Sequence, residues 1–314
     1  MSKKFTCFSA IICFFLIIIS CGHLKEAKNS YKNHNYDRTI TLCKKALETD
    51  SSNVDAMILM GKCYQQKNSL EKALQITQKA YQLSSASRKI AAQLVNIHNA
   101  IGDENLKDNK YAALNHYQTA IEIRPEDKNI QKKLASTYYA VGELKKAKHY
   151  YLKIQNQKNE SSISNMIAKI DKRIEKSQTL YKKGVIQYTK SKLNNALYFF
   201  NQASKQYPGS DDIQYYLLMT RARLLYEKGS VSELWDAIEL FGKASVLKNK
   251  QGEPWYWMGL AYHKKDKNEF TNAIDCLTKA LKLELNADLR EKCKEKLQEI
   301  KRRKKKMDEF WGRE

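Results

Sequence analysis

Apolar residues between positions 255 and 280 recur with the spacing of two α-helices. Four of them stand at i, i+3, i+4 and i+7, on one face of a first helix: Trp255, Met258, Gly259 and Tyr262. After a polar stretch at 264–269, a second helical pattern follows with Phe270, Ala273, Leu277 and Ala280. The pattern predicts a hairpin of two helices with one buried seam, where the small residues allow close approach of the backbones.

The small residue near the end of the second helix recurs along the whole chain. It is found as Ala46, Ala80, Ala120, Ile154, Ala203, Ala244 and Ala280. Successive separations are 34, 40, 34, 49, 41 and 36 residues. A single hairpin cannot bury its own seam, so a period in this range indicates stacked repeats that share a continuous core. The sequence therefore predicts about seven hairpins of unequal regularity.

Residues 255–280 resemble the tetratricopeptide (TPR) repeat, whose signature is W-x2-L-G-x2-Y followed by A-x3-F-x2-A. The match is good around Gly184 and Phe200, weaker in the first repeat, which lacks the leading aromatic residue, and altered at Ile154. The resemblance implies an all-α, right-handed solenoid of helical hairpins. A further helical pattern from Asp288 to about Lys306 predicts a capping helix, with an apolar face of Leu289, Cys293, Leu297 and Ile300.

Two insertions interrupt the regular period. Residues 102–109 are predicted to form a polar loop longer than the motif requires. Residues 162–176 carry isoleucines at helical spacing, so they predict either a separate helix or a longer first helix in the fifth repeat. The predicted organisation is a signal segment at 1–20, an array of about four repeats at 21–161, the linker helix at 162–176, about three repeats at 177–286, and the capping helix with a basic tail at 287–314.

The first twenty residues have the pattern of an export signal. Lys3 and Lys4 precede an apolar run at 5–19, which is shorter than the ~20 residues of a spanning helix. The run ends in Ser20-Cys21-Gly22, which resembles the lipidation motif of bacterial lipoproteins. That resemblance implies cleavage before Cys21 and a diacylglycerol on its sulfur, with a short uncleaved anchor as the alternative.

Composition changes this picture only in part. The formal charge of +22 favours anionic partners, although a lysine-rich composition alone explains it as well. Four cysteines lie in predicted helices without metal-ligand spacing: Cys43, Cys63, Cys276 and Cys293. They are expected to be packed free thiols, with a Cys43–Cys63 bridge left open.

Motifs for catalysis are missing from the sequence. It contains no G-x-S-x-G, H-E-x-x-H, phosphate-binding glycine loop or CxxC pair, and its six histidines are scattered. We therefore expect no enzymatic activity, no cofactor and no metal site.

The resemblance to TPR proteins implies that the first helices line a groove for a partner. In the N-terminal half this groove is expected to be cationic and amide-rich, and in the C-terminal half it is expected to be rich in tyrosine, although exposed tyrosines also pack on neighbouring repeats. The expected groove residues are Lys28, Lys62, Asn96, Asn99, Lys132, Tyr139, Tyr181, Tyr188, Tyr215, Tyr256 and His263.

A run of six basic residues stands near the C-terminus: Lys301, Arg302, Arg303, Lys304, Lys305 and Lys306. Cations are favourable at the end of a helix, so a solvated helix end is one interpretation. The other is contact with an anionic surface, with Phe310 and Trp311 as interfacial aromatics.

Together these features predict a non-enzymatic, membrane-anchored scaffold that binds a protein or peptide partner in the bacterial cell envelope. The expected location is the periplasmic side of the inner or outer membrane, with surface exposure left open, and no nucleic acid is expected as a partner. The alternatives are a ligand-handling accessory of an envelope transport system and a structural homo-oligomer.

Overall fold

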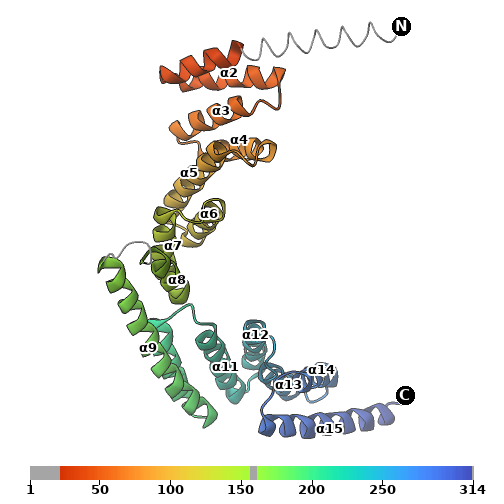
Figure 1. Ribbon diagram of the computed structural model, residues 1–314. Helices are drawn as coiled ribbons and strands as arrows, with labels where there is room; N and C mark the ends of the chain where they lie inside the picture. Colours follow the sequence, from red (N-terminus) through yellow and green to blue (C-terminus); the bar gives the residue numbers. More distant parts are fainter. Residues whose placement is uncertain (1–21, 156–160, 313–314) are drawn as a thin grey trace. The chain divides into compact units, whose positions relative to one another are not determined.

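The computed structural model describes residues 22–155 and 161–312, and its regular elements are all helices (Figure 1). Residues 22–32 are helical. The helices of the N-terminal half that follow are α2 (Tyr36–Thr49), α3 (Val54–Gln66), α4 (Leu70–Leu83), α5 (Arg88–Asn105), α6 (Lys110–Ile123), α7 (Lys128–Val141) and α8 (Leu144–Gln155). Those of the C-terminal half are α9 (Ser161–Thr189), α10 (Leu193–Gln206), α11 (Asp211–Lys228), α12 (Val231–Leu247), α13 (Glu253–Lys265), α14 (Phe270–Lys282) and α15 (Ala287–Phe310).

The chain divides into two compact units. Unit 1 comprises residues 1–141 and 145–163, and unit 2 comprises residues 142–144 and 164–314. In each unit, consecutive helices pair as a first and a second helix of a hairpin. The domain boundaries predicted from the sequence stay a prediction.

The buried seam lies where the sequence pattern places it. All six alanines of the repeated position are fully buried, and Ile154 is buried as well. In the hairpin of α13 and α14, a Cβ on Gly259 would lie 2.8 Å from Leu277 Cγ and 3.1 Å from the backbone oxygen of Ala273. Only a glycine allows this approach. The helices and their buried seam confirm the all-α fold of stacked hairpins predicted from the sequence.

Helix α9 joins the extra segment to the fifth repeat. It runs for 29 residues without interruption from Ser161 to Thr189. Ile163 and Ile170 are buried on it, and farther along the hydroxyl of Ser177 donates to the backbone oxygen of Ala203 at 2.9 Å. Residues 162–176 therefore lengthen the first helix of the fifth repeat and do not form a separate helix.

The prediction of a loop at 102–109 is wrong for its first half. Helix α5 continues to Asn105, and Gly102 lies inside it. A Cβ on Gly102 would lie 2.4 Å from Tyr117 Cε1, so the glycine makes room for a buried tyrosine of α6. The extension also places Asn99 and Asp103 at i and i+4, on one side of the helix.

Helix α15 caps the last hairpin, as predicted. Its first turn is fixed by the side chain of Asn286, which accepts from the backbone N–H of Leu289 at 2.8 Å. Cys293, Leu297 and Ile300 are buried and belong to one apolar cluster with residues of α13 and α14. The helix thereby covers apolar surface that the last hairpin cannot bury alone.

The cysteines of the described chain are free thiols, and Cys43 and Cys63 form no disulfide. Burial raises the pKa of Cys43 to about 12 and that of Cys63 to about 11. Both thiols are therefore protonated at neutral pH and pack as small apolar groups.

Candidate functional site

The first helices of unit 1 present three exposed polar side chains on successive repeats. They are Lys62 on α3, Asn96 on α5 and Lys132 on α7, and together they define what we name the first-helix face of unit 1. Within the described ranges, none of the three makes a hydrogen bond or an ion pair through its side chain. These side chains are exposed to solvent.

Other residues predicted for this groove already have partners in the fold. Lys28 is exposed and pairs with Asp55 on the next first helix at 3.2 Å. Tyr139 is half-buried. Exposed ion pairs of this kind contribute little stability, so a ligand that displaces Asp55 from Lys28 costs the fold little free energy.

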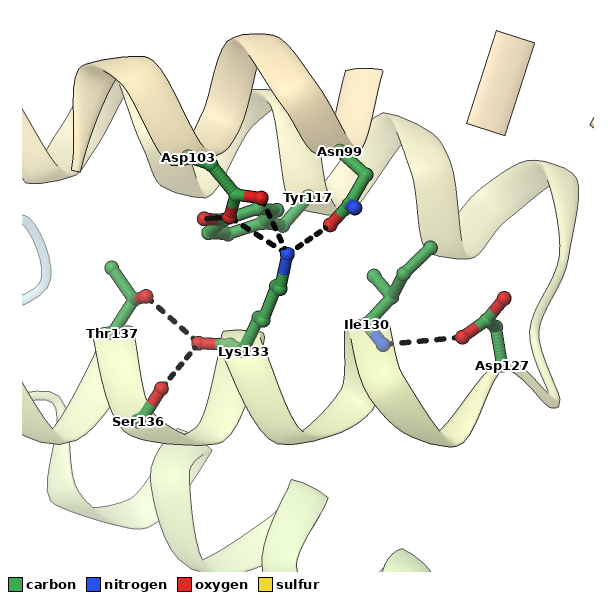
Figure 2. A network of polar contacts seen from close by, with 8 residues as sticks. All are labelled: Asn99, Asp103, Tyr117, Asp127, Ile130, Lys133, Ser136 and Thr137. Atoms are coloured by element: carbon green, nitrogen blue, oxygen red, sulfur yellow. Dashed lines mark hydrogen bonds and ion pairs between the residues drawn. The ribbon is translucent and has the colours of Figure 1, made fainter. Parts of the chain in front are cut away.

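Asn99 belongs to a polar network that ties α5, α6 and α7 together (Figure 2). Lys133 Nζ donates to Asn99 Oδ1 and to both carboxylate oxygens of Asp103, each at 2.7 Å. The hydroxyl of Tyr117 donates to Asp103 Oδ1 at 2.6 Å, and burial together with this carboxylate raises the pKa of Tyr117. The amide oxygen of Asn99 is therefore engaged within the protein.

In unit 2 the predicted tyrosine groove is largely buried, which corrects four of the expected residues. Tyr188, Tyr215, Tyr256 and His263 are all buried. Tyr188 and Tyr215 belong to the main apolar cluster of unit 2, where both rings pack edge-on against Tyr216 at 5.2 Å between centroids. Their large apolar area makes packing on neighbouring repeats more favourable than exposure.

Helix α15 is the reason why Tyr256 and His263 are covered. Tyr256 shares a cluster with Cys293, Leu297 and Ile300 of that helix, and burial raises the pKa of Tyr256 to about 12. Burial lowers the pKa of His263, and the nearby ammonium of Lys296 lowers it further. The end of the expected groove is thus occupied by the protein's own capping helix.

Tyr181 is the least covered member of the predicted tyrosine set. Its ring is half-buried and packs edge-on against Tyr216 at 5.7 Å, with Phe200 at 6.1 Å. Burial raises the pKa of Tyr181, and the neighbouring Tyr216 and Asp212 add to the shift. It lies at the edge of the aromatic cluster and keeps some access to solvent.

Arg223 of α11 lies within this aromatic cluster and is only 8% exposed. Its guanidinium carbon is 4.7 Å from the centroid of the Tyr188 ring and 4.6 Å from that of Trp257. Its Nη2 donates to Ser191 Oγ at 3.2 Å, whereas Nε is buried without a hydrogen-bond partner. The two rings stabilise the cation through their π-faces.

Glu253, at the start of α13, holds the same two rings in place. Its Oε1 accepts from the Tyr188 hydroxyl at 2.6 Å and from Trp257 Nε1 at 3.3 Å. Burial raises the pKa of Tyr188 well above its ordinary value, and the carboxylate of Glu253 contributes to the shift. The tyrosine therefore remains a hydrogen-bond donor at all physiological pH values.

A cavity of about 380 Å³ adjoins these residues within unit 2. Its walls come from the end of α9, from α11, from the start of α13 and from the start of α15. The lining residues are Tyr188, Thr189, Ser191, Tyr216, Arg223, Glu253, Tyr256, Trp257, Asn286, Asp288, Leu289 and Lys292. The cavity combines aromatic walls with charges of both signs.

Four residues of these networks were not predicted from the sequence. Asp103 was not predicted because the sequence places it in a loop, and Lys133 was not predicted because its partner is Asp103. The i, i+4 spacing of Asn99 and Asp103 indicates that α5 continues. The resemblance to TPR repeats implies that the second, fifth, ninth and twelfth positions of a first helix face the groove. Glu253 stands at the second position, three residues before Tyr256, so this register identifies it. Arg223 falls outside that register, and nothing in its local pattern marks it.

The basic run lies on α15 and is only partly neutralised. Lys304 pairs with Asp308 at 2.7 Å, and Lys305 pairs with Glu309 at 3.7 Å. The other four residues of the run are exposed and have no carboxylate partner in the part of the chain that the structure covers. Phe310 and Trp311 beyond them are 77% and 62% exposed.

Two further predictions concern membranes and metals. Cys21 and the apolar run before it lie outside the described residues. Among the helices that are described, none is both long and apolar enough to span a bilayer. The same part of the chain contains no group of three or more His, Cys, Asp or Glu placed to hold a metal ion.

Comparisons with known proteins match two segments of the chain to a family. Residues 30–94 and 252–286 each match a family model described as Tetratricopeptide repeat. No curated protein sequence matches the chain at a significant level.

Solved structures with similarity to the chain include a tetratricopeptide repeat protein from Parabacteroides merdae. It is 15% identical, with 90% of this chain and 98% of that chain covered and a TM-score of 0.37. The MamA protein is 21% identical over 60% of this chain and 91% of its own, with a TM-score of 0.34. The TPR2AB domain of yeast Sti1, solved as a complex with pHSP90, is 15% identical over 90% and 96%, with a TM-score of 0.31.

Proposed function

We propose that this chain, which is a tetratricopeptide repeat protein, is a non-enzymatic scaffold that binds a protein or peptide partner while anchored to a membrane of the bacterial cell envelope. Stacked helical hairpins of this family generally serve protein interaction, and the fold places a row of polar side chains on successive first helices. The partner is proposed to bind at the first-helix face of unit 1.

One observation carries the choice of this face. Lys62, Asn96 and Lys132 are exposed on three successive first helices, and the fold uses none of their side chains. The corresponding side of unit 2 is filled by buried tyrosines and by α15. A cationic and amide-rich surface suits a partner segment that offers carboxylates and backbone groups, because charge complementarity accelerates association and sets register.

Matched charge reversals test the face. In the test variant, Lys62→Glu and Lys132→Glu alter the face; in the control, Lys44→Glu and Lys79→Glu alter exposed lysines of the second helices α2 and α4. Both variants change the net charge equally, so long-range electrostatic effects cancel in the comparison. After crosslinking in intact envelopes and purification, the test variant is expected to lose its partners while the control retains them. Equal retention by both variants contradicts the assignment.

Lipidation of Cys21 is the proposed means of anchoring. The support is the apolar run at 5–19 followed by Ser20-Cys21-Gly22. Leu24 and Ala27 already belong to the buried core of unit 1, so the first repeat begins only a few residues beyond the proposed lipid. Mass spectrometry of the mature N-terminus is expected to show a diacylated Cys21, and Cys21→Ser is expected to release the protein from membranes. An intact Met1 in the envelope fraction contradicts this anchor.

The basic end of α15 is proposed as a second contact, with an anionic lipid surface. Its support is the four exposed cations at 301, 302, 303 and 306 and the exposed rings of Phe310 and Trp311. Each cation near such a surface contributes ~1 kcal/mol at moderate ionic strength. Sedimentation with phosphatidylglycerol liposomes is expected to fall when these four residues become glutamine, and to fall for the wild type at high salt. Unchanged binding by the glutamine variant argues against a role for the run.

A further inference from the structure

The cavity of unit 2 contains a buried cation that the fold leaves without an ion pair. Arg223 is nearly buried, yet no carboxylate of the described chain lies within ion-pair distance of its guanidinium. One nitrogen is bonded to Ser191 Oγ, and Nε has no partner. Removing a charge from water is costly, and ring faces offset only part of that cost. A carboxylate that enters the cavity and approaches the guanidinium would recover much of the remainder.

The same cavity contains a fixed carboxylate with unused hydrogen-bonding capacity. Glu253 Oε1 accepts from both Tyr188 and Trp257, whereas its Oε2 accepts no hydrogen bond from any residue that the structure describes. Because two aromatic donors hold the carboxylate in place, its free oxygen has a defined position. An ammonium group is the ligand chemistry that such an oxygen prefers.

The remaining charges of the lining cancel each other. Lys292 pairs with Asp288 at 2.8 Å, and both are exposed. Arg223 and Glu253 are therefore the two charges left for a ligand, one of each sign. A purely anionic ligand is repelled by the carboxylate of Glu253, and a purely cationic ligand is repelled by the guanidinium of Arg223.

Size and apolar surface complete the description of a ligand. At about 380 Å³ the cavity lies at the small end of the usual range of ligand pockets, about 300–1,000 Å³. Tyr216, Trp257 and Leu289 supply apolar wall beside the two charges. We propose that this cavity binds a free α-amino acid with an apolar or aromatic side chain, its carboxylate toward Arg223 and its ammonium toward Glu253. This inference does not rest on the scaffold function proposed for unit 1.

A series of ligands tests the proposal on the unmodified protein. Isothermal titration calorimetry compares L-phenylalanine with N-acetyl-L-phenylalanine, which keeps only the negative charge, and with L-phenylalanine amide, which keeps only the positive one. Free leucine, methionine and tryptophan extend the series to other side chains. The zwitterion is expected to bind at least ~10-fold more tightly than either single-charge analogue, the factor that one lost charged contact of about 1.4 kcal/mol produces. Binding of N-acetyl-phenylalanine that equals or exceeds that of the best amino acid overturns the proposal, as does absence of binding across the four amino acids at millimolar concentration.

Variants locate the binding to the cavity. Arg223→Met and Glu253→Gln are each expected to weaken binding of the amino acid ~10-fold or more. Arg221→Met is the matched control, because Arg221 lies two residues away on α11, is exposed and does not line this cavity. Circular dichroism tests whether each variant folds. If Arg223→Met does not fold, the ligand series and Glu253→Gln still test the proposal. An equal loss in Arg221→Met and Glu253→Gln overturns the assignment to the cavity.

Discussion

In unit 1 the first helices carry lysine and asparagine side chains that remain in water, whereas in unit 2 the same side of the hairpins carries tyrosines that are buried around an arginine. Both units have the same hairpin architecture. The difference shows that a position in the repeat does not decide exposure by itself. A long aromatic side chain at such a position packs on the next first helix or on α15, while a lysine extends into solvent because burial of its ammonium is costly.

Removal of a buried tyrosine from unit 2 is expected to give the largest effect. Tyr215→Ala deletes a ring that is 2% exposed and is expected to lower the free energy of unfolding by about 3 kcal/mol. Tyr198→Ala removes a ring that is 60% exposed and is expected to change it by less than about 0.5 kcal/mol. Urea unfolding followed by tryptophan fluorescence measures unit 2 specifically, since all four tryptophans lie there. Equal stability of the two variants would mean that Tyr215 lies at the surface.

The sequence predicted the hairpins because their apolar spacing is a local property. Trp255, Gly259 and Ala280 define a seam whatever surrounds them, and the capping helix is recognisable from Cys293, Leu297 and Ile300 in the same way. Exposure of a groove residue depends on elements far away in the chain. The burial of Tyr256 depends on α15, and Arg223 acquires its aromatic neighbours from α9 and α13, so neither environment can be read from a local pattern.

A glycine pair compares close packing in unit 1 with open space in unit 2. Gly102→Ala places a methyl group 2.4 Å from Tyr117 Cε1 and is expected to destabilise unit 1 by about 2 kcal/mol through overpacking. Gly242→Ala on α12 meets no atom nearer than 4.0 Å and is expected to stabilise unit 2 slightly, by about 0.5 kcal/mol, since alanine is the better helix former. Hydrogen exchange resolved by peptide measures both units. A stabilised unit 1 in Gly102→Ala would show that Tyr117 does not pack as described.

Acid is expected to weaken unit 1 through a pair of histidines between α5 and α6. The Nδ1 atoms of His98 and His116 are 3.1 Å apart. Burial lowers the pKa of His98 to about 4, and the neighbouring His116 contributes to this shift. Burial also lowers the pKa of His116, whereas Glu71 raises it. Because the unfolded chain binds the proton more readily, this stability is complete above about pH 6.5 and is lost as the pH falls toward 4, by about 1 kcal/mol per unit. Thermal unfolding from pH 7 to 5 checks the slope, which His98→Gln should reduce. An identical slope in that variant excludes the pair.

Adjacent lysines of α7 provide the finest comparison. Lys133→Met removes the ammonium that joins Asn99 to Asp103 and is expected to cost about 1 kcal/mol, because the network is partly buried. Lys132→Met alters an exposed residue of the first-helix face and is expected to change stability by less than about 0.5 kcal/mol. Chemical denaturation followed by circular dichroism measures both. The reverse order of stabilities would mean that the network in Figure 2 does not form in solution.

We propose that the first-helix face of unit 1 is covered by a partner in the envelope, and lysine footprinting tests this claim most directly. Intact envelopes and the purified protein are labelled with an amine-reactive reagent, and mass spectrometry quantifies each lysine. We predict that Lys62 and Lys132 are protected in envelopes, while Lys44 and Lys79 of the second helices react equally in both samples. Equal reactivity of all four lysines in envelopes and in the purified protein would contradict the claim.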